Sequence, residues 1–176
     1  MKPILYIMCG LAFSGKSTLA KAIAKHTGAT LISQDAIWFE KLEEEKTTGN
    51  KPTYNAVLNI SRRKICEALA LGRSAVFDNT NAGFNHREEF RQIANECGAK
   101  SFVVYLNVSD EELLRRQNAN RITKERHDPQ EKDIQTVRDH FEAPTQDEKV
   151  LEFLPNEDVT NWLRRSLGSS GSFGEN

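Results

Sequence analysis

The sequence predicts an α/β protein of one domain, with a parallel sheet of about five strands and helices on both faces. Short apolar runs alternate with longer segments of helical periodicity along most of the chain, which is the pattern of strand–helix–strand units. Glycines and short polar turns separate these segments, as expected where one element ends and the next begins. The length of 176 residues suits one domain that buries a substantial core.

The first predicted unit is a strand, a glycine-rich loop and a helix. Residues 4–9 form an unbroken apolar run with the length of a buried strand. Residues 18–26 carry apolar side chains at helical spacing, and Gly28 follows as a stop signal. The connecting residues 10–17, GLAFSGKS, match the pattern G-x-x-x-x-G-K-[ST] at every fixed position.

This arrangement predicts a site for the phosphates of ATP or GTP together with Mg²⁺. The backbone N–H groups of such a loop and the positive end of the following helix point at one spot. Lys16 would supply a mobile charge for the β and γ phosphates, and the Ser17 hydroxyl can bind Mg²⁺. The residues expected to contact the nucleotide are Gly10, Phe13, Ser14, Gly15, Lys16, Ser17 and Thr18.

The second strand is expected at residues 30–33, and Asp35 follows it closely. In open α/β sheets the ligand lies beyond the carboxyl ends of the strands, so Asp35 should lie at the same edge as the loop. A carboxylate there can accept the proton of an attacking hydroxyl group. An Asp before an apolar segment is also a good helix N-cap, and the two roles are compatible.

The third strand, at residues 74–77, is followed by the sequence Asp-Asn-Thr-Asn at 78–81. An acid after a hydrophobic strand is typical of the second motif of phosphate-loop proteins, where it supports Mg²⁺ directly or through water. Asp78 could instead orient the acceptor substrate, with Thr80 beside it, and an Asx turn is the structural alternative.

The intervening and following segments complete the alternation. Charged residues 41–51 predict a solvated surface, and residues 53–71 a long helix. A helix over 85–97 carries Arg87 and Arg91, for which a solvated face is the default and a contact to an acceptor phosphate the alternative. The remaining expected elements are a strand at 101–108, a helix N-capped by Ser109, a helix at 130–141, a strand at 149–154 and a helix at 158–167.

A polar, arginine-bearing segment at about 119–133 lies between two predicted helices. Such a segment can close over bound phosphates, and its arginines then neutralise charge in the transition state. Arg116 and Arg121 are the preferred candidates, ahead of Arg126, and His127 is expected to be a surface residue. Residues 1–167 thus form the predicted domain, and the Gly/Ser-rich residues 168–176 a flexible tail.

The composition is that of a globular protein without a strong charge bias. Hydrophobic residues make up 38% of the chain, and 24 basic residues stand against 25 acidic ones. The overall basic character of many nucleic-acid-binding proteins is therefore absent, although a local basic patch could exist. No signal peptide and no apolar run long enough to span a membrane are visible. Cys9, Cys66 and Cys97 lack metal-ligand spacing and are expected to be reduced packing residues of a cytoplasmic protein.

Several phosphate-loop classes are excluded by what the chain lacks. GTPases carry Asn-Lys-x-Asp, whereas Asn50-Lys51 continues as Pro52-Thr53 here. The Leu-Ser-Gly-Gly-Gln stretch of transporter ATPases is absent, and AAA-type motors are larger than this chain. Small kinases remain, which predicts transfer of the γ-phosphoryl of MgATP to a hydroxyl acceptor.

From about residue 4 to residue 141 the sequence resembles the phage-type 5′-hydroxyl polynucleotide kinase domain and its bacterial relatives. The glycine-rich loop, Gln34-Asp35, residues 78–81, and Arg116 followed by Arg121 carry this resemblance. The resemblance implies a three-layer P-loop fold with strand order 2-3-1-4-5. It also implies that Asp35 is the general base, that Lys16 and Arg121 contact the transferred phosphoryl, and that Ser17 binds magnesium.

The sequence departs from that family at Trp38. Polynucleotide kinases carry an arginine three residues after the base, where it grips a phosphate of the acceptor. A tryptophan there could stack on a base or sugar, or pack in the core. The missing arginine keeps a small-molecule acceptor, such as an antibiotic, sugar or nucleoside, as an alternative to the 5′-OH of a polynucleotide. A nucleotide-dependent binding switch is the rival from a different functional class.

Overall fold

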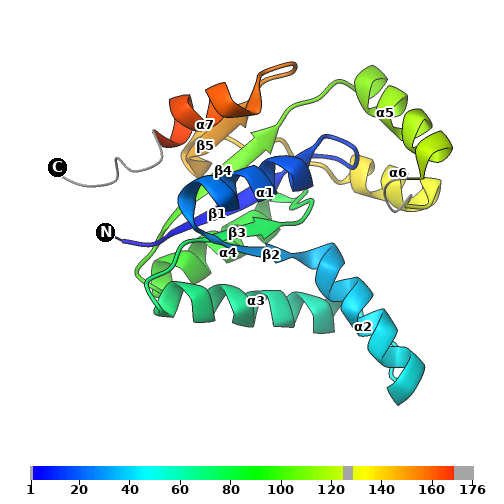
Figure 1. Ribbon diagram of the computed structural model, residues 1–176, viewed down its shortest axis with the longest axis horizontal. Helices are drawn as coiled ribbons and strands as arrows, with labels where there is room; N and C mark the ends of the chain where they lie inside the picture. Colours follow the sequence, from blue (N-terminus) through cyan, green and yellow to red (C-terminus); the bar gives the residue numbers. More distant parts are fainter. Residues whose placement is uncertain (1, 125–128, 169–176) are drawn as a thin grey trace.

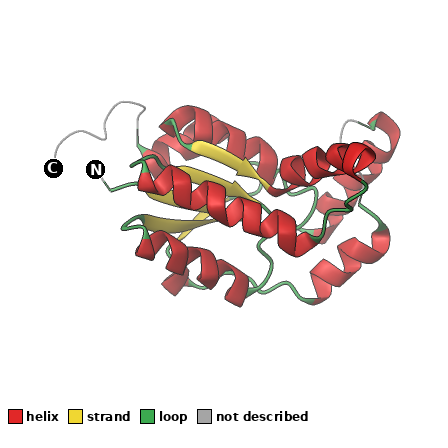
Figure 2. Cartoon of the chain, turned by 90° about the horizontal axis from the view of Figure 1, so that it is seen from below, coloured by secondary structure: helices red, strands yellow, loops and turns green. Residues whose placement is uncertain are grey.

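The computed structural model describes residues 2–124 and 129–168 and contains a five-stranded, fully parallel sheet (Figures 1 and 2). The strand order is β2-β3-β1-β4-β5, so the predicted order is confirmed. Each strand lies close to its predicted position. The strands are β1 (Ile4–Cys9), β2 (Thr30–Ser33), β3 (Ala75–Asp78), β4 (Lys100–Leu106) and β5 (Val150–Phe153).

Helices cover both faces of the sheet, and β1 shows how the two faces are divided. Leu5, Ile7 and Cys9 belong to the apolar cluster that also contains residues of α3 (Tyr54–Ala70) and α4 (Phe84–Glu96). Tyr6 and Met8, which point to the opposite face, belong to the cluster that contains residues of α1 (Lys16–Thr27) and α7 (Val159–Leu167). The helices are α1 (Lys16–Thr27), α2 (Gln34–Thr48), α3 (Tyr54–Ala70), α4 (Phe84–Glu96), α5 (Asp110–Thr123), α6 (Glu131–Asp139) and α7 (Val159–Leu167). A short 3₁₀ helix, η1 (Gln146–Glu148), precedes β5.

Local sequence signals set several helix ends as expected. The Ser109 hydroxyl accepts a hydrogen bond from the backbone N–H of Glu112 (3.4 Å), which confirms the predicted N-cap of α5. Gly28 ends α1 in the left-handed region, with φ of 70°.

All three cysteines are free, and burial raises the pKa of Cys9 to about 11. No helix within residues 2–124 and 129–168 is long and apolar enough to cross a membrane.

Two polar segments are more helical than expected. The charged residues 41–48 are the second half of α2, which extends away from the sheet in Figure 1. The predicted lid at 119–133 is divided, because α5 runs on to Thr123 and α6 begins at Glu131. Arg126, His127 and the predicted tail beyond Gly168 lie outside the described residues.

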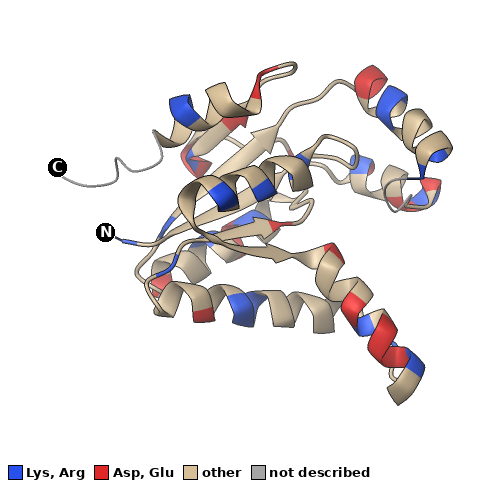
Figure 3. Ribbon diagram, in the orientation of Figure 1, with Lys and Arg blue, Asp and Glu red and all other residues tan. Residues whose placement is uncertain are grey.

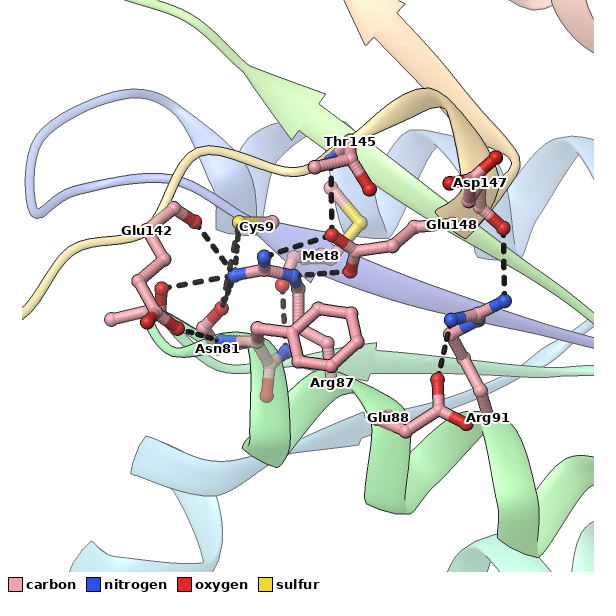
Figure 4. A network of polar contacts seen from close by, with 12 residues as sticks. Met8, Cys9, Asn81, Arg87, Glu88, Arg91, Glu142, Thr145, Asp147 and Glu148 are labelled. Carbon is pink, nitrogen blue, oxygen red and sulfur yellow. Dashed lines mark hydrogen bonds and ion pairs between the residues drawn. The ribbon is translucent and has the colours of Figure 1, made fainter.

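The expectation of a solvated face for Arg87 is wrong. Its side chain is fully buried, and its Nε and Nη2 atoms donate to the Glu148 carboxylate at 2.7 and 3.0 Å (Figure 4). Burial alone would raise the pKa of Glu148, but hydrogen bonds from Arg87 and from the Thr145 backbone N–H outweigh it, and the pKa is lowered. The partner lies 61 positions further along the chain, so no local pattern signals the pair.

We expect this ion pair to make stability depend on pH. The carboxylate contributes its full stabilisation above the ordinary pKa of Glu, 4.5, and loses it as the pH falls through its lower pKa in the folded protein. Glu148→Gln should lower the free energy of unfolding by about 3 kcal/mol at pH 7, because it leaves a buried charge without its counter-ion. Urea unfolding should show the gap between the two proteins narrowing below about pH 4.5; a constant gap would contradict this assignment.

Candidate active site

The glycine-rich loop between β1 and α1 is held by backbone contacts. A side-chain carbon at Gly10 would lie 3.0 Å from the Leu106 carbonyl oxygen and 3.1 Å from the Ser14 hydroxyl, so only glycine fits there. The Gly10 N–H donates to the Thr80 carbonyl (3.3 Å), which ties the loop to the segment that follows β3. Gly15, with φ of 99°, turns the chain into α1. The loop is therefore fixed by backbone geometry while its concave side stays available to a ligand.

The loop fits an anionic ligand such as a nucleotide phosphate. No side chain caps the N-terminus of α1, and its first turn holds no acidic residue. The Ser14 hydroxyl is 3% exposed and has no hydrogen-bond partner among the described residues. Lys16 Nζ donates to the Leu11 carbonyl at 2.7 Å, within the same loop. A bound phosphate would offer acceptors to both groups, as the sequence predicts.

The two predicted Mg²⁺ ligands lie together. Ser17 hydrogen-bonds the Asp78 carboxylate at the end of β3. The pKa of Asp78 is raised, mainly because the side chain is buried and in smaller part because Asp35 lies nearby. The hydrogen bond with Ser17 and the charge of Lys16 act in the opposite direction and lower it. The described residues contain no cluster of three or more His, Cys, Asp or Glu that would bind a metal alone. Mg²⁺ in phosphate sites is usually bound by one or two protein ligands together with the phosphates.

A cavity of about 450 Å³ opens beside these residues. Lys16, Ser17, Asp35, Asp78 and Thr80 all line it. They come from the carboxyl ends of β1, β2 and β3 and from the elements that follow, so the predicted convergence at one sheet edge is observed. We call this space the acceptor-side cavity.

Asp35 reaches this cavity from the first turn of α2 and does not cap the helix. The Ser33 hydroxyl is the N-cap, because it accepts a hydrogen bond from the Ala36 N–H (3.3 Å). The capping interpretation of Asp35 is therefore wrong. Its carboxylate is exposed at the cavity and is placed where it can accept a proton.

Trp38, a predicted substrate contact, packs against the core cluster formed with α3 and α4 and is not among the residues that line the acceptor-side cavity. Phe39, its neighbour, lines that cavity and is 41% exposed. Phe39 is four residues and Trp38 three residues after Asp35, and helical spacing places both near the face of α2 that carries Asp35. Spacing alone therefore could not have selected Phe39, and the packing of α2 decides which of the two reaches the cavity.

A second cavity, of about 460 Å³, lies on the other side of the loop. Phe13, Ser14, Gly15 and Thr18 line it together with Arg116. Other members of its wall come from distant elements: Asn120 of α5, Phe153 of β5 and Val159 of α7. This nucleotide-side cavity could hold the base and ribose of a nucleotide whose phosphates occupy the loop.

The two predicted lid arginines are placed differently. Arg116 Nη1 donates to the loop carbonyls of Phe13 (3.3 Å) and Ser14 (3.0 Å), and its Nε donates to Glu112 (2.7 Å). Arg121 pairs with Glu131 at 2.8 Å, which joins the end of α5 to the start of α6, and it is not among the residues lining either cavity. The structure thus brings Arg116, but not Arg121, to the loop.

We expect Arg116→Ala to weaken nucleotide binding about 10-fold, because it removes the hydrogen bonds that hold the loop. Arg115→Ala is the matched control, because Arg115 also lines the nucleotide-side cavity. Arg115 and Arg116 both pair with the Glu112 carboxylate and together lower its pKa to about 2. In the described chain, the hydrogen bonds of Arg115 go to Glu112 alone. Titration of a fluorescent ATP analogue checks both variants; equal losses would show that the loop contacts do not matter.

Comparisons with known proteins agree with this geometry. Over 113 residues the chain is 27% identical to L-seryl-tRNA(Sec) kinase of Methanococcus maripaludis, covering 64% of this chain and 44% of that protein. The chain thus spans less than half the length of this relative.

Solved structures share the fold. A gluconokinase from Sinorhizobium meliloti 1021 superposes with a TM-score of 0.66 at 22% identity, covering 94% of this chain and 90% of that one. Chaetomium thermophilum Kti12 in complex with ADP-AlF3 superposes with a TM-score of 0.69 at 14% identity, covering 96% of this chain and 100% of that one. The APS kinase CysC of Mycobacterium tuberculosis in complex with AMPPNP and APS superposes with a TM-score of 0.60 at 15% identity, covering 94% of this chain and 96% of that one.

The resemblance to the phage-type polynucleotide kinase domain stays a prediction, because the relatives named above are other kinases and Kti12. The sequence model of the family AAA_33, described as an AAA domain, matches residues 5–144. The size argument that excluded AAA-type motors therefore does not exclude the AAA domain itself. The chain belongs to this family of kinase-like P-loop proteins.

Proposed function

We propose that the protein is an ATP-dependent kinase that transfers the γ-phosphoryl group of MgATP to a hydroxyl group of a small acceptor. One observation supports this above the others: Lys16, Ser17, Asp35 and Asp78 line a single cavity at the mouth of the glycine-rich loop. A nucleotide-binding switch has no need of a carboxylate such as Asp35 at that place. The kinase names of the relatives point the same way.

The residues divide the reaction among them. Asp35 takes the proton of the acceptor hydroxyl, whose oxygen then bonds to the γ-phosphorus as the bond to the β–γ bridging oxygen breaks and ADP leaves. The Lys16 ammonium, which donates to the Leu11 carbonyl in this structure, neutralises negative charge on the transferred phosphoryl group. Ser17 and Asp78 would hold Mg²⁺, which when bound neutralises charge on the β and γ phosphates.

The walls of the acceptor-side cavity favour a small acceptor over a polynucleotide end. Phe39 of α2 and Ile134 and Val137 of α6 supply apolar surface. Asp35, Asp78 and Asp133 line the cavity against Lys16 and Lys21. Acidic residues also outnumber basic ones along α2, which leads away from the cavity (Figure 3), so a polyanion that approached along this helix would be repelled. The position at which polynucleotide kinases carry an arginine is occupied by Trp38, which packs against the core.

The test is phosphate transfer from γ-labelled ATP with Mg²⁺. The acceptors are a panel of small hydroxyl compounds beside 5′-hydroxyl RNA and DNA oligonucleotides, with Lys16→Ala as the inactive control. Label on a small compound supports the proposal, and label on an oligonucleotide would replace it with polynucleotide kinase activity. ATP binding without transfer to any acceptor would favour the binding switch.

We expect Asp35→Asn to lower phosphoryl transfer by about 100-fold or more, because it removes the proton acceptor and keeps the shape of the side chain. ATP binding should change little, because Asp35 lies on the acceptor side of the loop. Glu40→Gln removes another exposed carboxylate from α2 and is the control, expected to transfer normally. Transfer by Asp35→Asn at the wild-type rate would show that Asp35 is not the base.

A further inference from the structure

Arg87 joins two segments that are far apart in the sequence (Figure 4), and each segment adjoins residues that line the acceptor-side cavity. One segment is the β3–α4 loop, residues 79–83, which follows Asp78. The other, residues 140–149, follows α6 and leads to β5. Asp78 and Thr80 line the cavity, and so do Ile134 and Val137 of α6.

The β3–α4 loop is held from two directions. Arg87 Nη1 donates to the carbonyls of Asn81 (3.1 Å) and Ala82 (2.9 Å). The Asn81 side chain, 1% exposed, donates to the Met8 carbonyl of β1 at 2.6 Å. The loop that follows Asp78 is thus fixed to both α4 and the central strand.

The segment after α6 is attached to the same guanidinium. Arg87 Nη1 also donates to the Glu142 carbonyl (2.9 Å), while Nε and Nη2 bind the Glu148 carboxylate. The Glu142 backbone N–H donates to the Ala82 carbonyl (2.9 Å), and its carboxylate accepts from the Phe84 N–H at the start of α4. The Glu142 backbone therefore contacts the β3–α4 loop directly at Ala82, and its side chain contacts the first residue of α4.

These contacts lie close to the cavity wall. α6 ends at Asp139, three residues before Glu142, and Phe141 packs against the core cluster. A guanidinium has five N–H donors in a fixed plane, so one buried arginine can set the relative position of several acceptors. An apolar contact of the same size would allow the segments to slide, because it has no direction.

We propose that Arg87 and Glu148 are positioning residues that hold α6 at a set distance from Asp78 and Thr80 and so define the acceptor-side cavity. The kinetic consequence rests on the proposed kinase function, whereas the structural consequence does not need an acceptor. Neither residue lines the cavity, so both act through the segments that they join.

Glu148→Gln tests this, because it keeps the volume of the side chain and removes the charge. Hydrogen exchange should become about 10-fold faster in peptides covering residues 131–142, and the KM for the acceptor found in the label-transfer panel should rise about 10-fold. ATP affinity should change less than the acceptor KM, because neither Arg87 nor Glu148 lines the nucleotide-side cavity.

Glu89→Gln is the matched control. It breaks the partly exposed Arg62–Glu89 ion pair (2.5 Å), which also involves α4 but does not contact the segment after α6. It should leave both the exchange of residues 131–142 and the acceptor KM unchanged. The general loss of stability expected of Glu148→Gln speeds exchange in all stable elements, so the proposal requires a larger increase in residues 131–142 than in α1.

Wild-type exchange of α6 in a folded Glu148→Gln protein would overturn the proposal, whatever the outcome of the transfer assay. If Glu148→Gln does not fold, Arg87→Lys decides the question, because it keeps a positive charge beside Glu148 and removes the guanidinium N–H groups that donate to the Asn81, Ala82 and Glu142 carbonyls. Faster exchange of residues 131–139 in this variant supports the proposal, and unchanged exchange overturns it. A failed transfer assay with faster α6 exchange would count against the kinase function alone.

Discussion

The parallel direction of all five strands brings their carboxyl ends to one edge of the sheet, and this constraint places the glycine-rich loop, Asp35 and Asp78 together. β1 runs into the glycine-rich loop, β2 is followed by Asp35, and β3 ends with Asp78. Each crossover helix returns the chain to the opposite edge, so segments far apart in the sequence emerge side by side. The acceptor-side cavity is the space that these emerging segments enclose.

Within this frame the loop and the cavity walls are stabilised by different means. The loop depends on backbone geometry, above all on the close approach of Gly10 to Leu106. The walls depend on buried polar contacts, because the connecting segments are too irregular to pair as strands or helices. Burial disfavours the charged form of the Asp78 carboxylate, which raises its pKa. A carboxylate retained under those conditions is typical of a functional site rather than of a stable core.

The two arginines at the predicted lid illustrate how one segment serves two purposes. Arg116 lies a full helical turn before Asn120 on α5 and holds the loop from the nucleotide side. Arg121 instead joins α5 to α6 through Glu131. α6 in turn provides apolar surface to the acceptor-side cavity. The region that the sequence suggests as a cover for phosphates therefore also shapes the place where an acceptor would bind.

The sequence by itself determined the strands, their order by resemblance, the glycine-rich loop and the caps at Ser109 and Gly28, because these depend on patterns within a few residues or on a motif. Only the tertiary structure decided which side chains face the site. Trp38 and Phe39 differ by one position, and the packing of α2 on α3 selects which of them reaches the cavity. Arg87 is part of a polar, charged stretch, and its burial depends on Glu148, which no local pattern connects to it. Contacts between distant segments carry no signal in a single sequence, because their partners are chosen by the fold.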